Sequence, residues 1–159
     1  REKTIIKRTL FDLKKAKDAL NRGAYPRGHS DQNRSTLGAM QDTILICAER
    51  GYVDIARELL LRSSDITNSY DEFSMASPLQ IAAENGHYEM CDWLIQTGVD
   101  INRQDRLGRS ALIDAAEKGL LNIIKLLIDN KVDMNAVDRE HFSALSYCLD
   151  VVDMDENKE

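Results

Sequence analysis

Apolar and polar positions along this chain follow a pattern that recurs every 33 residues. Ser77, Ser110 and Ser143 lie one period apart, and each is followed two positions later by a leucine. The same spacing separates Ala83 from Ala116, Gly86 from Gly119, Asp100 from Asp133, Asn102 from Asn135, and Asp105 from Asp138. A fixed period of about 20 to 50 residues is the mark of a solenoid, in which similar units stack in a row. The pattern therefore predicts a repeat protein.

The first half of each unit predicts a turn followed by a short helix. In the unit from Asp105, residues 105–109 contain the Asp and Gly of a tight turn, and Ser110 can cap the helix that follows. Residues 111–118 place Leu112, Ala115 and Ala116 at the spacing of one buried helical stripe. Gly119 tolerates the left-handed backbone that ends many helices.

The second half predicts another helix over residues 120–130. Its expected inner face consists of Ile123, Ile124, Leu127 and Ile128. Helices shorter than about 12 to 15 residues are marginal alone in water, so each pair must stack on its neighbours. The alanines have small side chains and let successive first helices approach closely.

Several motifs in register resemble the ankyrin repeat. Ser77-Pro78-Leu79-Gln80 is close to the Thr-Pro-Leu-His of that family, and residues 82–87 and 98–102 resemble its later motifs. The resemblance implies an all-α solenoid of stacked helix-turn-helix units with short β-turn fingers. The histidine of the family motif is replaced here by Leu45, Gln80, Ile113 and Ser146. Because that histidine helps to tie neighbouring repeats, we expect weaker or different ties.

The register divides the chain into segments. Ankyrin-type repeats are expected over 37–152, as units 37–71, 72–104 and 105–137 and a half repeat 138–152. Asp42 takes the cap position of the first unit, and two extra residues lengthen the turn before Ser77. Residues 1–26 are expected to form a basic capping helical segment and residues 27–36 a loop, with an acidic tail over 153–159.

Charge is distributed unevenly. Residues 1–36 carry ten Lys or Arg against four Asp or Glu, and the remainder carries eleven against 23, which together give the net charge of −6. The chain therefore combines a basic front with an acidic solenoid. It begins without an initiating Met or a signal-type apolar core, and we interpret it as a piece of a larger intracellular protein of the cytoplasm or nucleus.

Composition argues against several classes of function. Cys47 and Cys148 fall in the register of Ala82 and Ala115, so we expect the thiols to pack in the core rather than to form disulfides or bind metal. Glycine-rich phosphate loops, nucleophile–base sets and metal-ligand spacings are absent from the sequence. We therefore expect neither enzymatic activity nor a cofactor, metal site or small-molecule substrate, and no membrane span.

The resemblance implies a concave binding groove formed by the fingers and the exposed part of the first helices. The fingers would contribute Tyr70, Phe73, Arg106, Leu107, Arg109, Arg139 and Phe142. The helix ends would contribute Glu49, Glu84, Asn85, Glu117, Lys118 and Asp150.

Four of these residues recur at one position of successive units, namely Glu49, Glu84, Glu117 and Asp150. We call them the acidic ladder. Aligned carboxylates could steer a basic or amphipathic segment of another protein, with Phe73, Leu107 and Phe142 as apolar contacts, for example within a chromatin complex. The simpler interpretation is a row of solvated helix ends.

Other interpretations remain open. Phe73 could fold back onto the stack, and Trp93 is expected to be half-buried or on the convex surface. The module could be a passive spacer within its parent protein. The basic front could contact nucleic acid through Lys14, Lys15 and Lys17, although it equally fits a solvated face of a capping helix.

Overall fold

A computed structural model describes the backbone of residues 36–61 and 69–149, with side chains from residue 43 onward. Its helices are α2 (Thr36–Arg50), α3 (Val53–Leu60), α4 (Pro78–Glu84), α5 (Tyr88–Gln96), α6 (Ala111–Glu117) and α7 (Leu121–Asp129). Residues 144–149 are helical as well. The predicted N-terminal helix, most of the predicted loop, Asp150 and the acidic tail lie outside the described residues.

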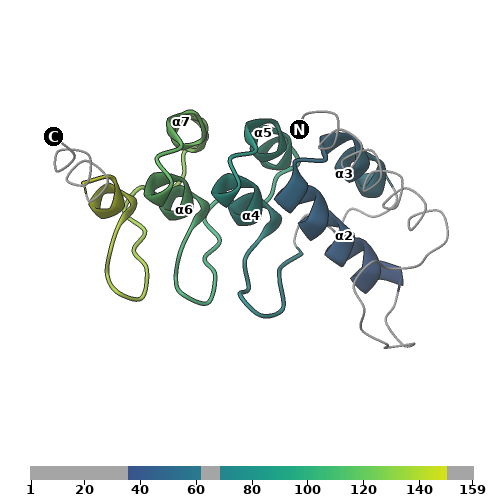
Figure 1. Ribbon diagram of the computed structural model, residues 1–159, viewed down its shortest axis with the longest axis horizontal. Coiled ribbons are helices and arrows are strands. Elements are labelled where there is room, and N and C mark those ends of the chain that lie inside the picture. Colours follow the sequence, from purple (N-terminus) through teal and green to yellow (C-terminus); the bar gives the residue numbers. More distant parts are fainter. Residues whose placement is uncertain (1–35, 62–68, 150–159) are drawn as a thin grey trace, which may run out of the picture.

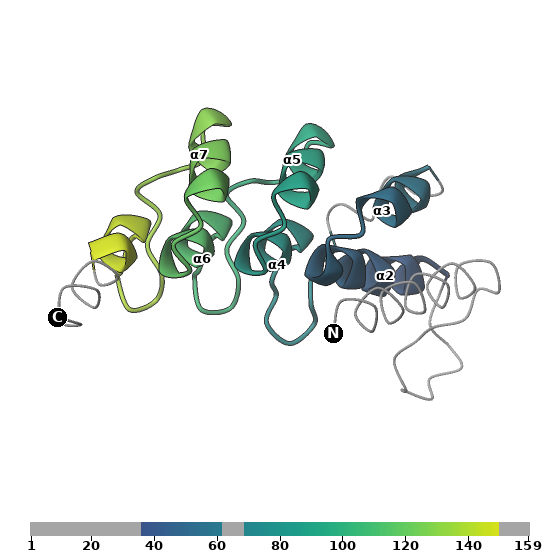
Figure 2. The same cartoon turned by 45° about the horizontal axis from the view of Figure 1, so that its top comes forward.

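The helices form two layers (Figures 1 and 2). An inner layer contains α2, α4 and α6, in which α4 packs between the other two. An outer layer contains α3, α5 and α7, and each outer helix packs on the inner helix that precedes it. Loops project from the inner layer on the side away from the outer helices, and these are the fingers. The expected all-α solenoid is confirmed.

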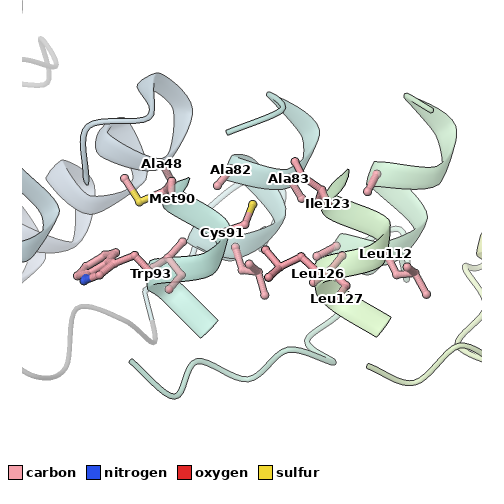
Figure 3. Close-up of a cluster of buried hydrophobic side chains, with 14 of the residues drawn as sticks. Ala48, Ala82, Ala83, Met90, Cys91, Trp93, Leu112, Ile123, Leu126 and Leu127 are labelled. Atoms are coloured by element: carbon pink, nitrogen blue, oxygen red, sulfur yellow. The ribbon is translucent and has the colours of Figure 1, made fainter. Parts of the chain in front are cut away.

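Small side chains set the spacing of the inner layer. Ala48, Ala82, Ala83, Ala115 and Ala116 are all fully buried or nearly so. Larger side chains from the outer helices, among them Met90, Ile123 and Leu127, fill the space behind them (Figure 3). The helices α4 and α6 have seven residues each, too few to be stable alone, so their stability comes from this packing.

The serines cap the inner helices as predicted. Ser77 Oγ accepts a hydrogen bond from the backbone N–H of Gln80 at 3.2 Å, and Gln80 Oε1 accepts one from the N–H of Ser77 at 3.0 Å. This reciprocal pair satisfies two donors that the first helical turn leaves unpaired. Ser110 caps α6 in a similar way, through the N–H of Ile113 at 3.4 Å.

Gln80 also replaces the tie expected from the family histidine. Its Nε2 donates to the backbone carbonyl of Arg109, 2.8 Å away in the next finger. One buried side chain thus caps its own helix and binds the following repeat. At the equivalent position of the next unit, Ile113 is fully buried and has no polar atom with which to make such a tie.

Hydrogen bonds hold each finger in shape. Asp105 Oδ1 accepts from the N–H groups of Leu107 and Arg109 at 2.8 and 2.9 Å. Asp138 repeats the arrangement one unit later. Neighbouring fingers are joined as well, because the N–H of Arg106 donates to Ser74 and that of Arg139 donates to Leu107, at 2.8 and 2.9 Å.

The first finger is one residue longer. The N–H of Asp71 donates to the carbonyl of Ala76, five positions later, whereas that of Asp105 donates to Arg109, four positions later. The lengthening expected before Ser77 therefore lies partly in the finger itself. Met75 has a φ of 62° there, in the place of Gly108 with a φ of 75°, which is an unusual conformation for a residue with a long side chain.

Two expectations about the ends of the stack were wrong. Helix α2 already begins at Thr36, so Asp42 lies inside a helix rather than capping one. Its sequence contains no proline between residues 36 and 50, which allows a helix of 15 residues. At the other end, Ile128 is exposed although it was assigned to the inner face, whereas Leu126 is buried.

The leucine of the last described helix is more exposed than its counterparts. Leu145 is 68% exposed, whereas its counterparts Leu112 and Leu79 are 4% and 1% exposed. Both counterparts are covered by the next unit, and no described helix follows residue 149. The cysteines pack nearly as expected, since Cys47 and Cys91 are buried and Cys148 is half-buried. Burial raises the pKa of Cys47 and Cys91 to about 12.

We predict that Gln80→Ala lowers the free energy of unfolding by about 2 kcal/mol, because it removes one buried and one partly buried hydrogen bond. Urea unfolding followed by circular dichroism measures the change. Gln96→Ala is the control, since the Gln96 side chain is exposed and, among the described residues, bonds to Asp92 alone; this substitution should lower the free energy of unfolding by less than about 0.5 kcal/mol. Equal effects of the two substitutions would show that Gln80 does not tie the repeats.

Candidate protein-binding surface

The inner helices end in acidic residues. Glu84 and Glu117 are the last residues of α4 and α6, and Glu49 is the last but one of α2. Asn85 and Lys118 are the residues that follow α4 and α6. The C-terminal end of a helix carries partial negative charge, so a carboxylate there costs a few tenths of a kcal/mol or more. Helix stability therefore does not explain these glutamates.

The rungs of the acidic ladder differ in their partners. Glu49 forms an ion pair with Arg50 at 4.0 Å. Glu117 forms one with Arg109, a finger residue of the same unit. Glu84 is exposed and has no ion pair within the described part of the chain. Asp150 lies outside the described residues. Glu84 is thus the rung whose charge is most available to a partner.

Arg109 is held inside the stack. Its Nε donates to Asp114 Oδ1 at 2.8 Å, its Nη2 bonds to Glu117, and its side chain is only 18% exposed. The guanidinium also lies 5.5 Å from the ring centroid of Tyr147 in the next repeat. Arg109 therefore joins two repeats. Its predicted role in binding a partner stays a prediction, and its guanidinium already pairs with Asp114 and Glu117 within the chain.

Asp114 is a buried carboxylate. It is 8% exposed, at a position held by Ile81 one repeat earlier and by Tyr147 one repeat later. Burial raises its pKa to about 6, although the adjacent Arg109 acts in the opposite direction. The pKa of Glu117 is lowered, because Arg109 donates a hydrogen bond to its carboxylate.

A related network closes the last finger. Tyr147 Oη donates to Asp138 Oδ2 at 2.7 Å. Burial alone would raise the pKa of Asp138, but this bond and the backbone N–H groups of Phe142 and Glu140 outweigh it and lower the pKa. The same bond raises the pKa of Tyr147 to about 12. The finger is therefore braced by an ionised carboxylate at neutral pH.

The fingers expose apolar side chains. Phe73 is 81% exposed, so it does not fold back onto the stack, and Leu107 is 60% exposed. Phe142 and Tyr70 are also exposed, although Phe142 touches the edge of Tyr147 and Tyr70 lies against Arg103. Arg106 and Arg139 are exposed at equivalent finger positions. The structure thus places the predicted apolar contacts on three successive fingers.

The sequence did not predict two hollows in the outer layer. One lies between α3 and α5 and has a volume of about 500 Å³. The other has a volume of about 510 Å³ and is lined by Tyr88 of α5 and by residues of α7. Trp93 lines the first hollow and is only 7% exposed, so it is more buried than expected. The large side chain of Trp93 was the one feature of the sequence that pointed to the hollow between α3 and α5.

The described residues hold no cluster of three or more His, Cys, Asp or Glu side chains suited to a metal ion. None of the described helices is long and apolar enough to cross a membrane. What the surface offers is a row of charged and apolar side chains on a stack braced by hydrogen bonds.

Stacked helix pairs with hydrogen-bonded fingers define the class of α-helical repeat solenoids. The family model for ankyrin repeats in three copies matches residues 44–138, which is more than half of the chain. The chain therefore belongs to the ankyrin-repeat family. Ankyrin repeats generally serve as protein–protein interaction modules.

Curated relatives agree with this assignment. Residues of this chain are 31% identical over 67 positions to human ankyrin repeat and KH domain-containing protein 1. The same identity and length hold for ankyrin repeat domain-containing protein 17 of human and mouse. In each case the match covers 42% of this chain and only 3% of the relative. The match therefore spans only a small part of each relative's length.

We predict that Asp114 makes stability depend on pH. Because its folded pKa of about 6 lies above the ordinary value of 3.8, it binds a proton more tightly in the folded state. Its stabilising contribution is therefore complete in acid and is lost as the pH rises from about 4 through 6.

Urea unfolding of the wild type and of Asp114→Asn at pH 4.5 and 7 measures this effect. As the pH rises from 4.5 to 7, the free energy of unfolding of the wild type should fall by about 2 kcal/mol relative to that of the variant. If the free energies of unfolding of the two proteins differ by the same amount at both pH values, the pKa of Asp114 is not raised.

Proposed function

We propose that this chain binds a basic or amphipathic segment of a partner protein along the fingers and the ends of the inner helices. The observation that carries the proposal is Glu84. It is an exposed carboxylate without an ion pair in the described chain, placed where the helix dipole disfavours it, in the middle of the inner row. A cationic group of a partner would offset the unfavourable interaction of the Glu84 carboxylate with the helix dipole.

Apolar contact would come from the fingers on either side. Phe73 and Leu107 project from successive fingers, and exposed apolar side chains at such sites often anchor a partner. The finger backbones are fixed by Asp71 and Asp105. Little conformational entropy would then be lost on binding.

Charge supports a basic partner. Residues 37–159 carry a net charge of −12, from eleven Lys or Arg against 23 Asp or Glu. Such a surface accelerates the encounter with a cationic segment and repels phosphates. Extended basic segments such as histone tails have the required chemistry, so a chromatin complex in the nucleus fits the proposal, as does a basic partner in the cytoplasm.

The test reverses one charge. Glu84→Lys is compared with Asp129→Lys, since both are exposed acids at the last position of a helix, one inner and one outer. We expect Glu84→Lys to weaken binding to a specific set of partners at least about tenfold, and Asp129→Lys to leave it nearly unchanged. Quantitative pulldown from cell extract, with partners identified by mass spectrometry, measures both.

Circular dichroism and a thermal melt must first show that both variants are folded like the wild type. If both retain the same partners as the wild type, the inner-helix ends are not the binding surface. If none of the three proteins captures a specific partner, the passive spacer is the better interpretation.

A further inference from the structure

The hollow between α3 and α5 lies on the outer layer, away from the fingers. Its lining includes Tyr52 at the start of α3, Asp54 and Arg57 within α3, and residues of α5. Its volume of about 500 Å³ is within the range of sites that hold small ligands or single side chains.

Aromatic residues line this hollow. Tyr52 and Tyr88 are half-buried and exposed, respectively, and Trp93 is nearly buried. In Figure 3 the indole of Trp93 points away from Leu126 and the rest of the apolar cluster. The indole N–H of Trp93 makes no hydrogen bond within the described part of the chain. It is also not fully inaccessible, since Arg103 Nε is the fully inaccessible side-chain atom that lacks a partner among the described residues. The indole N–H is therefore an unused donor that solvent can reach.

Acidic residues surround the aromatic ones. The lining includes Asp54, Glu89 and Asp92 against one cation, Arg57. None of these four side chains forms an ion pair within the described residues, and Asp92 accepts only a hydrogen bond from Gln96 at 2.8 Å. The hollow therefore carries excess negative charge next to aromatic rings, which is the combination that attracts organic cations.

The next pair of outer helices lacks this combination. One period later, Trp93, Asp92 and Glu89 correspond to Leu126, Lys125 and Asn122. These three line the hollow on α7, together with Tyr88 and Asp129. The repeat itself thus requires neither the tryptophan nor the carboxylates. Their joint presence between α3 and α5 is particular to that place.

We propose that this outer hollow is a second docking site, which holds a lysine or arginine side chain from a basic segment of a partner protein. The aliphatic stem would lie against Tyr52 and Tyr88, and the cation would approach Glu89 and Asp92. The indole N–H of Trp93 would donate to a backbone carbonyl of the same segment. This site is separate from the inner-helix ends and does not depend on their role.

The test uses the single tryptophan of the chain as a local reporter. In a ¹H–¹⁵N spectrum the Trp93 indole gives one cross-peak, which is followed during titration with a hexalysine peptide. We expect a saturable shift of that cross-peak. Hexaglutamate should leave it in place.

Variants assign the shift to the hollow. The double variant Glu89→Asn and Asp92→Lys introduces the residues of the next repeat, and it should weaken the indole response about tenfold while the amide spectrum stays that of a folded protein. Glu84→Lys should weaken the shifts of amides near the inner-helix ends but leave the indole response intact. This separates the failure of one site from the failure of the other.

Three results would overturn the proposal. The chemical shift of the indole cross-peak could stay unchanged at peptide concentrations that saturate the shifts of other amides. Its response could be unchanged in the double variant. It could also disappear in Glu84→Lys, which would mean that binding at the inner-helix ends causes it.

Discussion

Close packing between alanine-rich inner helices is the interaction on which the rest of the structure depends. Helices of seven residues cannot persist alone, so α4 and α6 exist because their neighbours cover them. Ala82, Ala83, Ala115 and Ala116 bring these helices close enough to bury one another. Leu145, after whose helix no further helix is described, is exposed, unlike its buried counterparts Leu79 and Leu112. Stability is thus a property of the interfaces between units rather than of any unit.

Polar and exposed side chains fall into two groups, those that bind within the stack and those that face solvent. Gln80 and Arg109 each bind across a repeat boundary, and Asp114 and Glu117 are the partners of Arg109. These groups are occupied in holding the stack together. The side chains of Glu84, Phe73 and Leu107 are exposed, and within the described residues they form no hydrogen bond or ion pair with another repeat. Function is best sought among the residues that the fold does not need.

The period alone predicted most of the fold. It placed the serine caps, the starts of α4 and α6 and the buried alanines, because these features recur at each unit. It could not predict the pairing of Arg109 with Asp114, since the counterparts of Asp114 are Ile81 and Tyr147 and the pair occurs once. The hollow beside Trp93 was missed for a similar reason. It depends on how α3 and α5 pack across a boundary, where the counterpart of Trp93 is Glu58 in one unit and Leu126 in another.

The central claim is that exposed groups on the inner-helix ends and fingers form the main binding surface, while buried polar groups hold the repeats together. Amide hydrogen exchange, measured for the protein alone and in complex with a captured partner, tests it most directly. We expect added protection at residues 71–76, 84–86 and 105–109, with little change in α7. Protection confined to the outer helices, or no added protection in a stable complex, would contradict the claim.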